Sequence, residues 1–450
     1  MSEKMGTGNG VQQASGTTVD IDYAECAVPK WSRRSFVTMF MIMLGFTFFS
    51  ASMWVGQEMA AGLDFWGFIK ALLLGGAILG VYTGLLGYVG AETGLSLDLL
   101  SKRAFGEKGS YISSALTSFT QIGWFGVGIA MFAIPVAREL FGGSTAVEWV
   151  LILIAGACMT ASAYFGIKSL TIISYIAVPL VAILGTVAMI MAVRQGDGTI
   201  VDQFAKSSGS LSVIGGAGLA IGSFVSGGTA TPNFTRFAKN GKQGTIATVV
   251  AFFIGNSLMF FFGAISYIFV GGNDIFEVMI RLNLFYLAIL VLGLNIWTTN
   301  DNALYTAGLG LANIFNKRKK PMVLISGVIG TLLSVWLYYN FCGWLNILNC
   351  TLPPVGIILV LSYFMNKKAY DTDTVKMVTV NWFAVAGVIL GAIVANVVTW
   401  GIASINGMAV AAVCYVIGEL VNKNKSNELR FFDKKRLPNY DGNLFLFGII

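Results

Sequence analysis

The sequence predicts an all-α integral membrane protein with twelve transmembrane helices. Three observations support this prediction: the composition, the recurrence of long apolar segments, and the placement of the basic residues. Hydrophobic residues make up 56% of the 450 positions and charged residues only 11%, whereas soluble domains carry about 25% charged residues. Lipid is therefore the expected solvent, and the alternating ten-residue segments of an outer-membrane barrel are not seen in the sequence.

Apolar segments long enough to cross a bilayer as helices follow one another from residue 35 onward. The expected spans, numbered in chain order, are 35–61, 64–91, 110–140, 147–166, 169–194, 211–236, 244–271, 284–314, 321–339, 342–365, 376–399 and 402–421. Polar residues flank this region, so we expect an N-terminal tail at 1–34 and a C-terminal tail at 422–450.

The basic residues predict the orientation of the chain. With both termini in the cytoplasm, 24 of the 29 Lys and Arg residues fall in the tails and the cytoplasmic loops. Such an excess in short loops is typical of the cytoplasmic side of a membrane. The same placement explains the formal charge of +7 without a surface for nucleic acid.

Spans 1 and 6 are each interrupted midway by the same pattern of small residues. Phe48 and Phe224 both begin a Phe-x-Ser-small-small motif, and they lie 176 positions apart. Clustered Gly, Ser and Thr weaken a helix, and Pro232 also lacks a backbone donor. Because lipid cannot satisfy freed backbone groups, we expect both helices to be unwound at mid-membrane and to face a binding site.

The spacing of the interruptions predicts an internal repeat. Spans 1 and 6 are five helices apart, and five helices reverse the direction of the chain across the membrane. The predicted repeats are 35–194 and 211–365, related as inverted copies, with the last two spans at 376–421 outside them. Close packing of small residues between helices is the alternative, but it explains the matching motifs poorly.

Spans 3 and 8 carry polar clusters inside long apolar segments. Span 3 contains Gln121 and Trp124, and span 8 contains a polar run that begins at Asn295. Within that run, the i, i+3, i+4 spacing places Asn295, Thr298 and Thr299 on one helix face. Amides and hydroxyls at this depth usually line a site or hydrogen-bond between helices, because leaving them unpaired is costly.

The polar face of span 8 predicts an ion site. Its two hydroxyls, opposite the unwound carbonyls of span 1, offer neutral hard oxygens that suit a small cation such as sodium. A proton-coupled protein would instead need a titratable group near the midplane, and in a chain without histidine Asp301 is the main candidate. Asp301 can equally be a structural carboxylate that accepts hydrogen bonds from neighbouring helices.

The residue types near the interruptions predict the class of ligand. No Lys or Arg lies deep within a span, so an anion would find only helix N-termini for charge balance. Aromatic faces together with amide and hydroxyl groups suit a flat, uncharged ring with a hydrogen-bonding edge. The residues that offer these groups are Gln121, Trp124, Ser223, Phe224, Ser226 and Asn300. Trp124 taken alone is equally consistent with helix packing.

Four stretches resemble the nucleobase:cation symporter-1 family: 44–54, 121–128, 222–226 and 292–305. The likeness extends through nearly all of residues 35–400. It implies the inverted-repeat fold of the sodium-coupled amino-acid transporters, alternating access, and uptake of cytosine with sodium across a bacterial inner membrane. Sodium is the coupling ion in this expectation, and no cofactor is implied.

The resemblance also implies roles for particular residues. The base would lie between Trp124 and Phe224. The residues implied to contact its polar edge are Gln121, Ser223, Ser226, Asn300 and the backbone near Phe49. The residues implied to hold sodium are Gly45, Phe48, Asn295, Thr298 and Thr299. Span 6 departs from the family pattern at 227–233, and we expect this departure to affect flexibility or access more than the choice of base.

Other functions remain as alternatives. One is proton-coupled transport of another nucleobase or a hydantoin-like ring, with Asp301 as the titrating group. An ion channel would need a repeated filter motif, which the sequence lacks. An enzyme is not expected, because the chain has no histidine and its five cysteines are dispersed. The choice of base and the oligomeric state stay open.

Overall fold

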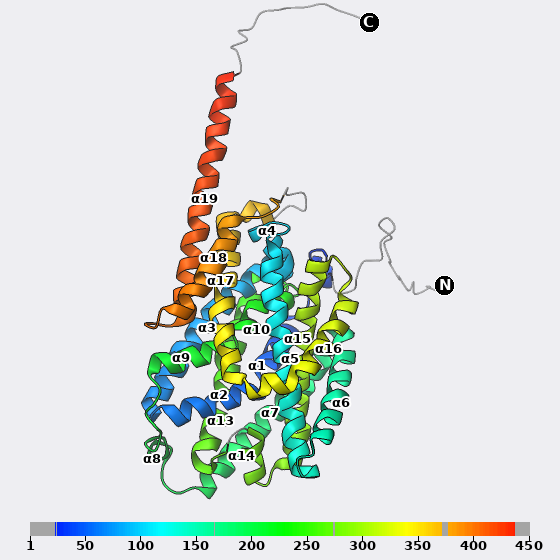
Figure 1. The fold of residues 1–450 in the computed structure, drawn as a ribbon, viewed down its shortest axis with the longest axis vertical. Helices are drawn as coiled ribbons and strands as arrows, with labels where there is room; N and C mark the ends of the chain where they lie inside the picture. The colour runs from blue at the N-terminus through cyan, green and yellow to red at the C-terminus, as the bar shows by residue number, and fades with distance from the viewer. Residues whose placement is uncertain (1–22, 24, 166, 273–274, 371–376, 437–450) are drawn as a thin grey trace, which may run out of the picture.

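The computed structural model consists of helices joined by short loops. It describes residue 23 and residues 25–165, 167–272, 275–370 and 377–436. Figure 1 shows a body of lengthwise helices with α4 (Leu97–Phe105) at one end, and α8 (Ile200–Phe204) and α14 (Ile275–Arg281) at the other. The last helix, α19 (Ala403–Arg436), projects from the end that holds α4.

Each expected span coincides with helical structure. Within residues 35–194 the helices are α1 (Phe36–Thr47) with α2 (Ser50–Gly62), α3 (Phe65–Thr93), α5 (Ser110–Phe141), α6 (Thr145–Tyr164) and α7 (Ile167–Gln195). Within residues 211–365 they are α9 (Val213–Gly222) with α10 (Val225–Ala230) and α11 (Pro232–Thr235), α12 (Gly241–Val250) with the π-helical turn η2 (Ala251–Gly255) and α13 (Asn256–Val270), α15 (Phe285–Phe315), α16 (Lys319–Tyr339) and α17 (Phe341–Met365). The remaining two are α18 (Trp382–Val397) and α19.

Length and hydropathy identify the helices that can cross a membrane. Within the described residues, eight helices qualify, and up to ten do if each of two bent pairs is counted as one span. Helices α15 and α18 are not among these. The polar run lowers the mean hydropathy of α15, and α18 is an apolar helix of only 16 residues.

Both helices with the small-residue motif are broken at the motif. The axes of α1 and α2 differ by 52°, and those of α9 and the segment Val225–Thr235 by 46°. At the first break Phe49 has an extended backbone with φ −127° and ψ 131°. At the second, Phe224 has φ −137° and ψ 5°, which ends one helix before the next begins.

Helices five spans apart pack against each other. The pairs are α3 with α12, α5 with α15, and α6 with α16. Glycines allow very close approach elsewhere in the body, because a Cβ on Gly263 of α13 would lie 1.9 Å from the carbonyl oxygen of Met53 on α2.

Two features differ from the sequence prediction. Helix α19 continues past residue 421 to Arg436, and the short helix α4 lies in a segment that was expected to be a loop. The side chain of Ser96 caps α4 by accepting a hydrogen bond from the backbone N–H of Leu99 at 3.3 Å. A search for apolar segments long enough to span a bilayer overlooks such a short amphipathic helix.

Candidate functional site

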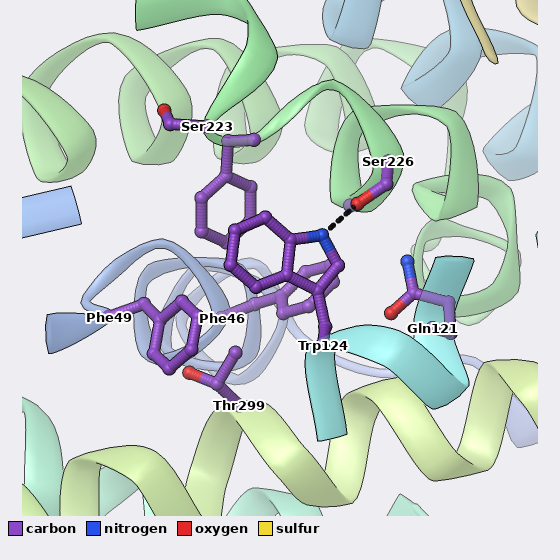
Figure 2. Close-up of a pocket in the computed structure, with 9 residues that line it drawn as sticks. Phe46, Phe49, Gln121, Trp124, Ser223, Ser226 and Thr299 are labelled. Carbon is purple, nitrogen blue, oxygen red and sulfur yellow. Dashed lines mark hydrogen bonds between the residues drawn. The ribbon is translucent and has the colours of Figure 1, made fainter. Parts of the chain in front are cut away.

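A small hollow lies where the two helix breaks meet α5 and α15 (Figure 2). Its nine lining residues, which define the central hollow, are Phe46, Phe49, Gln121, Trp124, Ser223, Phe224, Ser226, Gly227 and Thr299. The room inside it for a water-sized sphere is about 10 Å³, about enough for one water. A ring would therefore need the side chains around the central hollow to move apart.

The indole of Trp124 occupies the middle of this site. Its Nε1–H donates to the hydroxyl of Ser226 on α10 at 2.6 Å, as Figure 2 shows. The ring meets Phe49 edge-on at a centroid distance of 5.5 Å and Phe341 at 5.9 Å. Because a hydrogen bond and two ring contacts fix its position, Trp124 presents a rigid aromatic surface to the central hollow.

A second aromatic surface comes from the break in span 6. Phe224 lies edge-on to Phe46 at a centroid distance of 5.2 Å and to Phe252 at 5.3 Å. Phe46 and Gly227 line the central hollow although they were absent from the predicted site. A Cβ on Gly227 would lie 2.6 Å from the ring of Phe224, so glycine is required for this packing.

The polar atoms of the central hollow are few. The amide nitrogen of Gln121 is buried and has no hydrogen-bond partner in the described part of the chain. The hydroxyl of Ser223 donates to the carbonyl of Ala220 at 2.9 Å, while that of Ser226 accepts from Trp124. Since a buried unpaired donor is costly, Gln121 has capacity for a ligand acceptor.

Asn300 lies outside the lining of the central hollow. Its amide nitrogen donates to the carbonyl of Phe125 on α5 at 3.2 Å and to the sulfur of Met159 on α6 at the same distance. A Cβ on Gly128 of α5 would lie 2.4 Å from the amide oxygen of Asn300, which has no hydrogen-bond partner among the described residues. Of the seven residues predicted to contact a base, the structure brings together the other six.

Asn295 of α15 spans the break in the first helix. Its amide nitrogen donates to the carbonyl of Phe48, and its amide oxygen accepts from the backbone N–H of Ser50 at 2.9 Å. These two backbone groups are among those that the break between α1 and α2 frees. The Asn295 side chain thus pairs with both backbone groups. A helix can be interrupted away from water only if the freed backbone groups find such partners.

The other residues predicted to hold an ion gather at the same place. The hydroxyl of Thr298 lies 3.3 Å from the carbonyl oxygen of Gly45 and donates to the carbonyl of Asn295 at 2.7 Å. The hydroxyl of Thr299 lies 3.4 Å from the same Asn295 carbonyl and also lines the central hollow. The five predicted ion ligands therefore form one cluster of neutral oxygens beside the central hollow.

Asp301 points to a different neighbour. Its carboxylate accepts a hydrogen bond from the hydroxyl of Ser162 on α6 at 2.5 Å, and that hydroxyl also accepts from the indole of Trp297 at 2.7 Å. Asp301 is fully buried and does not line the central hollow. The second carboxylate oxygen of Asp301 is buried and has no hydrogen-bond partner among the described residues.

The second half of span 6 is hydrogen-bonded to surrounding elements. The hydroxyl of Thr229 lies 2.7 Å from that of Tyr82 on α3. Asn233 accepts from the backbone N–H at the start of α4, at 2.8 Å. Arg236, which is completely buried, donates to the hydroxyl of Tyr305 on α15 at 2.8 Å.

A small aromatic and polar hollow between two broken helices defines the class of membrane transporters whose substrate site lies at discontinuous helices. The chain belongs to the family of permeases for cytosine/purines, uracil, thiamine and allantoin, whose family model matches residues 27–418. It is therefore a multi-pass membrane permease and not an enzyme.

Known proteins show how close the relationship is. The chain is 44% identical to the cytosine permease of Escherichia coli strain K12 over 400 residues, which cover 88% of this chain and 94% of the relative. It is 23% identical to the hydantoin permease of Microbacterium maritypicum, over 73% of this chain and 74% of that one.

Solved structures share the fold. The closed conformation of Mhp1, a nucleobase-cation-symport-1 family transporter with bromovinylhydantoin bound, matches with a TM-score of 0.75 at 19% identity, covering 87% of this chain and 94% of that chain. A Na⁺-coupled sialic acid symporter matches with a TM-score of 0.65 at 15% identity, covering 87% of this chain and 90% of that chain. The resemblance inferred from the four sequence stretches is confirmed.

Proposed function

We propose that the protein takes up cytosine together with sodium by alternating access. The observation that carries this proposal is the central hollow, where aromatic rings and an unpaired amide donor adjoin a cluster of neutral oxygens. The 44% identity to a cytosine permease supports cytosine as the base. The hollow contains no charged residue, as a neutral ring requires.

The base would lie between the rings of Trp124 and Phe224. Stacking on aromatic side chains holds a nucleobase by its faces. The unpaired amide nitrogen of Gln121 would donate to an acceptor on its edge, and Ser223 and Ser226 supply hydroxyls. Asn300 would contribute only if its amide turned from α5 toward the ring.

Sodium would bind at the break between α1 and α2. Carbonyl oxygens of Gly45 and Phe48 would coordinate it together with oxygens of Asn295, Thr298 and Thr299. Hard oxygen ligands suit a hard cation. A carboxylate that drives proton coupling would be expected beside the substrate, whereas Asp301 faces α6. This placement favours sodium over protons.

The membrane topology belongs to the same proposal. Adding α15 and α18 to the ten candidate spans gives twelve, with inverted repeats at 35–194 and 211–365 and two further helices at 376–421. The end that holds α4 would face the cytoplasm, as would both tails, 1–34 and 422–450.

Uptake into proteoliposomes tests the proposal. With an inward sodium gradient and equal pH on both sides, radiolabelled cytosine should accumulate above its external concentration. A proton gradient without sodium should give no accumulation, and Asp301→Asn should retain the sodium-driven uptake. Accumulation driven by protons alone, and lost in Asp301→Asn, would establish the proton-coupled alternative. Saturation at low cytosine concentration distinguishes a carrier from a channel.

A further inference from the structure

The π-helical turn η2 interrupts the helix that follows the second break. It covers Ala251–Gly255, between α12 and α13. Turns of this kind are rare, and they appear frequently at functional sites because the extra residue weakens the helix. None of its five residues lines the central hollow or belongs to the proposed ion ligands. The turn nevertheless contacts Phe224, which lines the central hollow, and packs against the end of α1, which carries proposed ion ligands.

Phe252 connects the turn to the base site. Its side chain is fully buried, and its ring meets Phe224 edge-on at a centroid distance of 5.3 Å and an interplanar angle of 82°. The other edge contact of Phe224, with Phe46, also comes from outside its own helix. The orientation of Phe224, which would form one face of the base site, therefore depends on Phe252.

Gly255 connects the same turn to the ion site. A Cβ at this position would lie 2.5 Å from the hydroxyl of Thr47, 2.8 Å from the side chain of Leu44 and 3.4 Å from the ring of Phe48. These three residues form the last turn of α1 and the break itself. The turn η2 thus packs closely against the end of α1, and Asn295 of α15 donates to the carbonyl of Phe48, a proposed sodium ligand, at the same place.

We propose that η2 couples the sodium site to the base site, with Phe252 and Gly255 as positioning residues. When sodium orders the end of α1, the turn behind it is held in place, and Phe252 then fixes the ring of Phe224 against the base. By linkage, sodium tightens base binding and the base tightens sodium binding by the same factor. This inference depends on the proposed function and adds the route of coupling.

Phe253 provides a matched control within the same turn. Its ring faces α3, since a Cβ on Gly76 would lie 3.2 Å from it, and a Cβ on Gly80 would lie 3.9 Å from its own Cβ. A Phe253→Leu substitution removes the same number of atoms as Phe252→Leu from the same helical turn. It leaves the contact with Phe224 intact.

The test measures the affinity for cytosine of the purified full-length protein in sodium and in choline. The ratio of the two dissociation constants is the coupling factor. Aromatic pairs contribute about 0.5–1.5 kcal/mol, and only the part of the contact that differs between the sodium-bound and sodium-free states enters the ratio, so Phe252→Leu should lower the coupling factor by up to about 12-fold. Phe253→Leu should keep it within about twofold of the unsubstituted protein. Gly255→Ala should weaken sodium binding at zero cytosine and also lower the coupling factor.

The outcomes separate the two proposals. If the unsubstituted protein binds no cytosine in sodium, the proposed function is wrong. If it shows sodium-enhanced binding that Phe252→Leu leaves unchanged, or that Phe253→Leu lowers equally, the coupling route through η2 is wrong. Melting temperatures identify variants that fail to fold. If Phe252→Leu fails, Phe252→Met, which keeps an apolar side chain of similar volume, takes its place and should show the same loss of coupling.

Discussion

Replacing Trp124 tests the proposed stacking surface, and Trp297 supplies a matched control. Both indoles donate to a serine hydroxyl, Trp124 to Ser226 at 2.6 Å and Trp297 to Ser162 at 2.7 Å. Only Trp124 lines the central hollow. The two residues therefore differ mainly in their access to a ligand, and the same substitution at each position separates binding from general stability.

The structure sets the size of the expected effect. Alanine substitution of a side chain that stacks on a base costs about 1–3 kcal/mol, so Trp124→Ala should weaken cytosine binding by about 5- to 140-fold. Trp124→Phe keeps an aromatic face and loses the bond to Ser226. A net loss of about 0.5–1.5 kcal/mol for that bond predicts a smaller effect, about 2- to 12-fold. Cytosine affinity should therefore decrease in the order tryptophan, phenylalanine, alanine at position 124.

Equilibrium binding of radiolabelled cytosine at saturating sodium measures these differences, with melting temperatures recorded for each variant. Trp297→Ala should lower the melting temperature and leave the dissociation constant within about twofold, because its indole contacts α6 and not the central hollow. Cytosine affinity that survives Trp124→Ala would refute the stacking model. Equal loss in both alanine variants would show that the effect is structural.

Three further predictions concern the ion site, a buried carboxyl group on α4 and helix packing. Thr299→Ala should raise the sodium concentration for half-maximal uptake and weaken cytosine binding, because this hydroxyl adjoins both sites; unchanged sodium dependence would place the ion elsewhere. Burial raises the pKa of Asp98 on α4 from 3.8 to about 6. Between these two pKa values the folded protein holds a proton that the unfolded chain releases. The stability that this group contributes is therefore complete below pH 3.8 and is lost as the pH rises through about 6. At 1.36 kcal/mol per pH unit, the interval between the two pKa values corresponds to about 3 kcal/mol of unfolding free energy. The melting temperature should fall between pH 4 and pH 6, and Asp98→Asn should flatten that change; equal slopes in both proteins would contradict the assignment. Gly263→Ala should lower the free energy of unfolding by about 1–3 kcal/mol or more, because the new Cβ would lie 1.9 Å from the Met53 carbonyl oxygen. Gly343→Ala, whose Cβ would have nothing within 4 Å, should leave the melting temperature unchanged.

The positions of the helix breaks could be predicted because their cause is local. Clustered small residues after Phe48 and Phe224 weaken a helix wherever it lies, and lipid excludes such backbone unless something else pairs with it. The polar face of α15 was equally predictable, because the i, i+3, i+4 spacing fixes which side chains share a face. The cluster formed by Asn295, Thr298 and Thr299 at the first break follows from these two facts together.

The orientation of Asn300 and the partner of Asp301 could not be predicted from spacing. Helical periodicity shows which residues share a face, but not which neighbouring helix lies opposite that face. Asn300 meets α5 where Gly128 leaves room for its amide, and Asp301 meets Ser162 on α6. Phe46 was missed for a related reason, since it lies within the helical part of α1 and enters the hollow only because the chain bends after it.

An experimental density map of the protein with cytosine and sodium tests the central claim most directly. We predict a flat ring between Trp124 and Phe224, with Gln121 at its edge, and an ion beside the carbonyl of Phe48 and the hydroxyls of Thr298 and Thr299. Density for the ring at any other place in the molecule, or an ion position without these oxygens, would contradict the account.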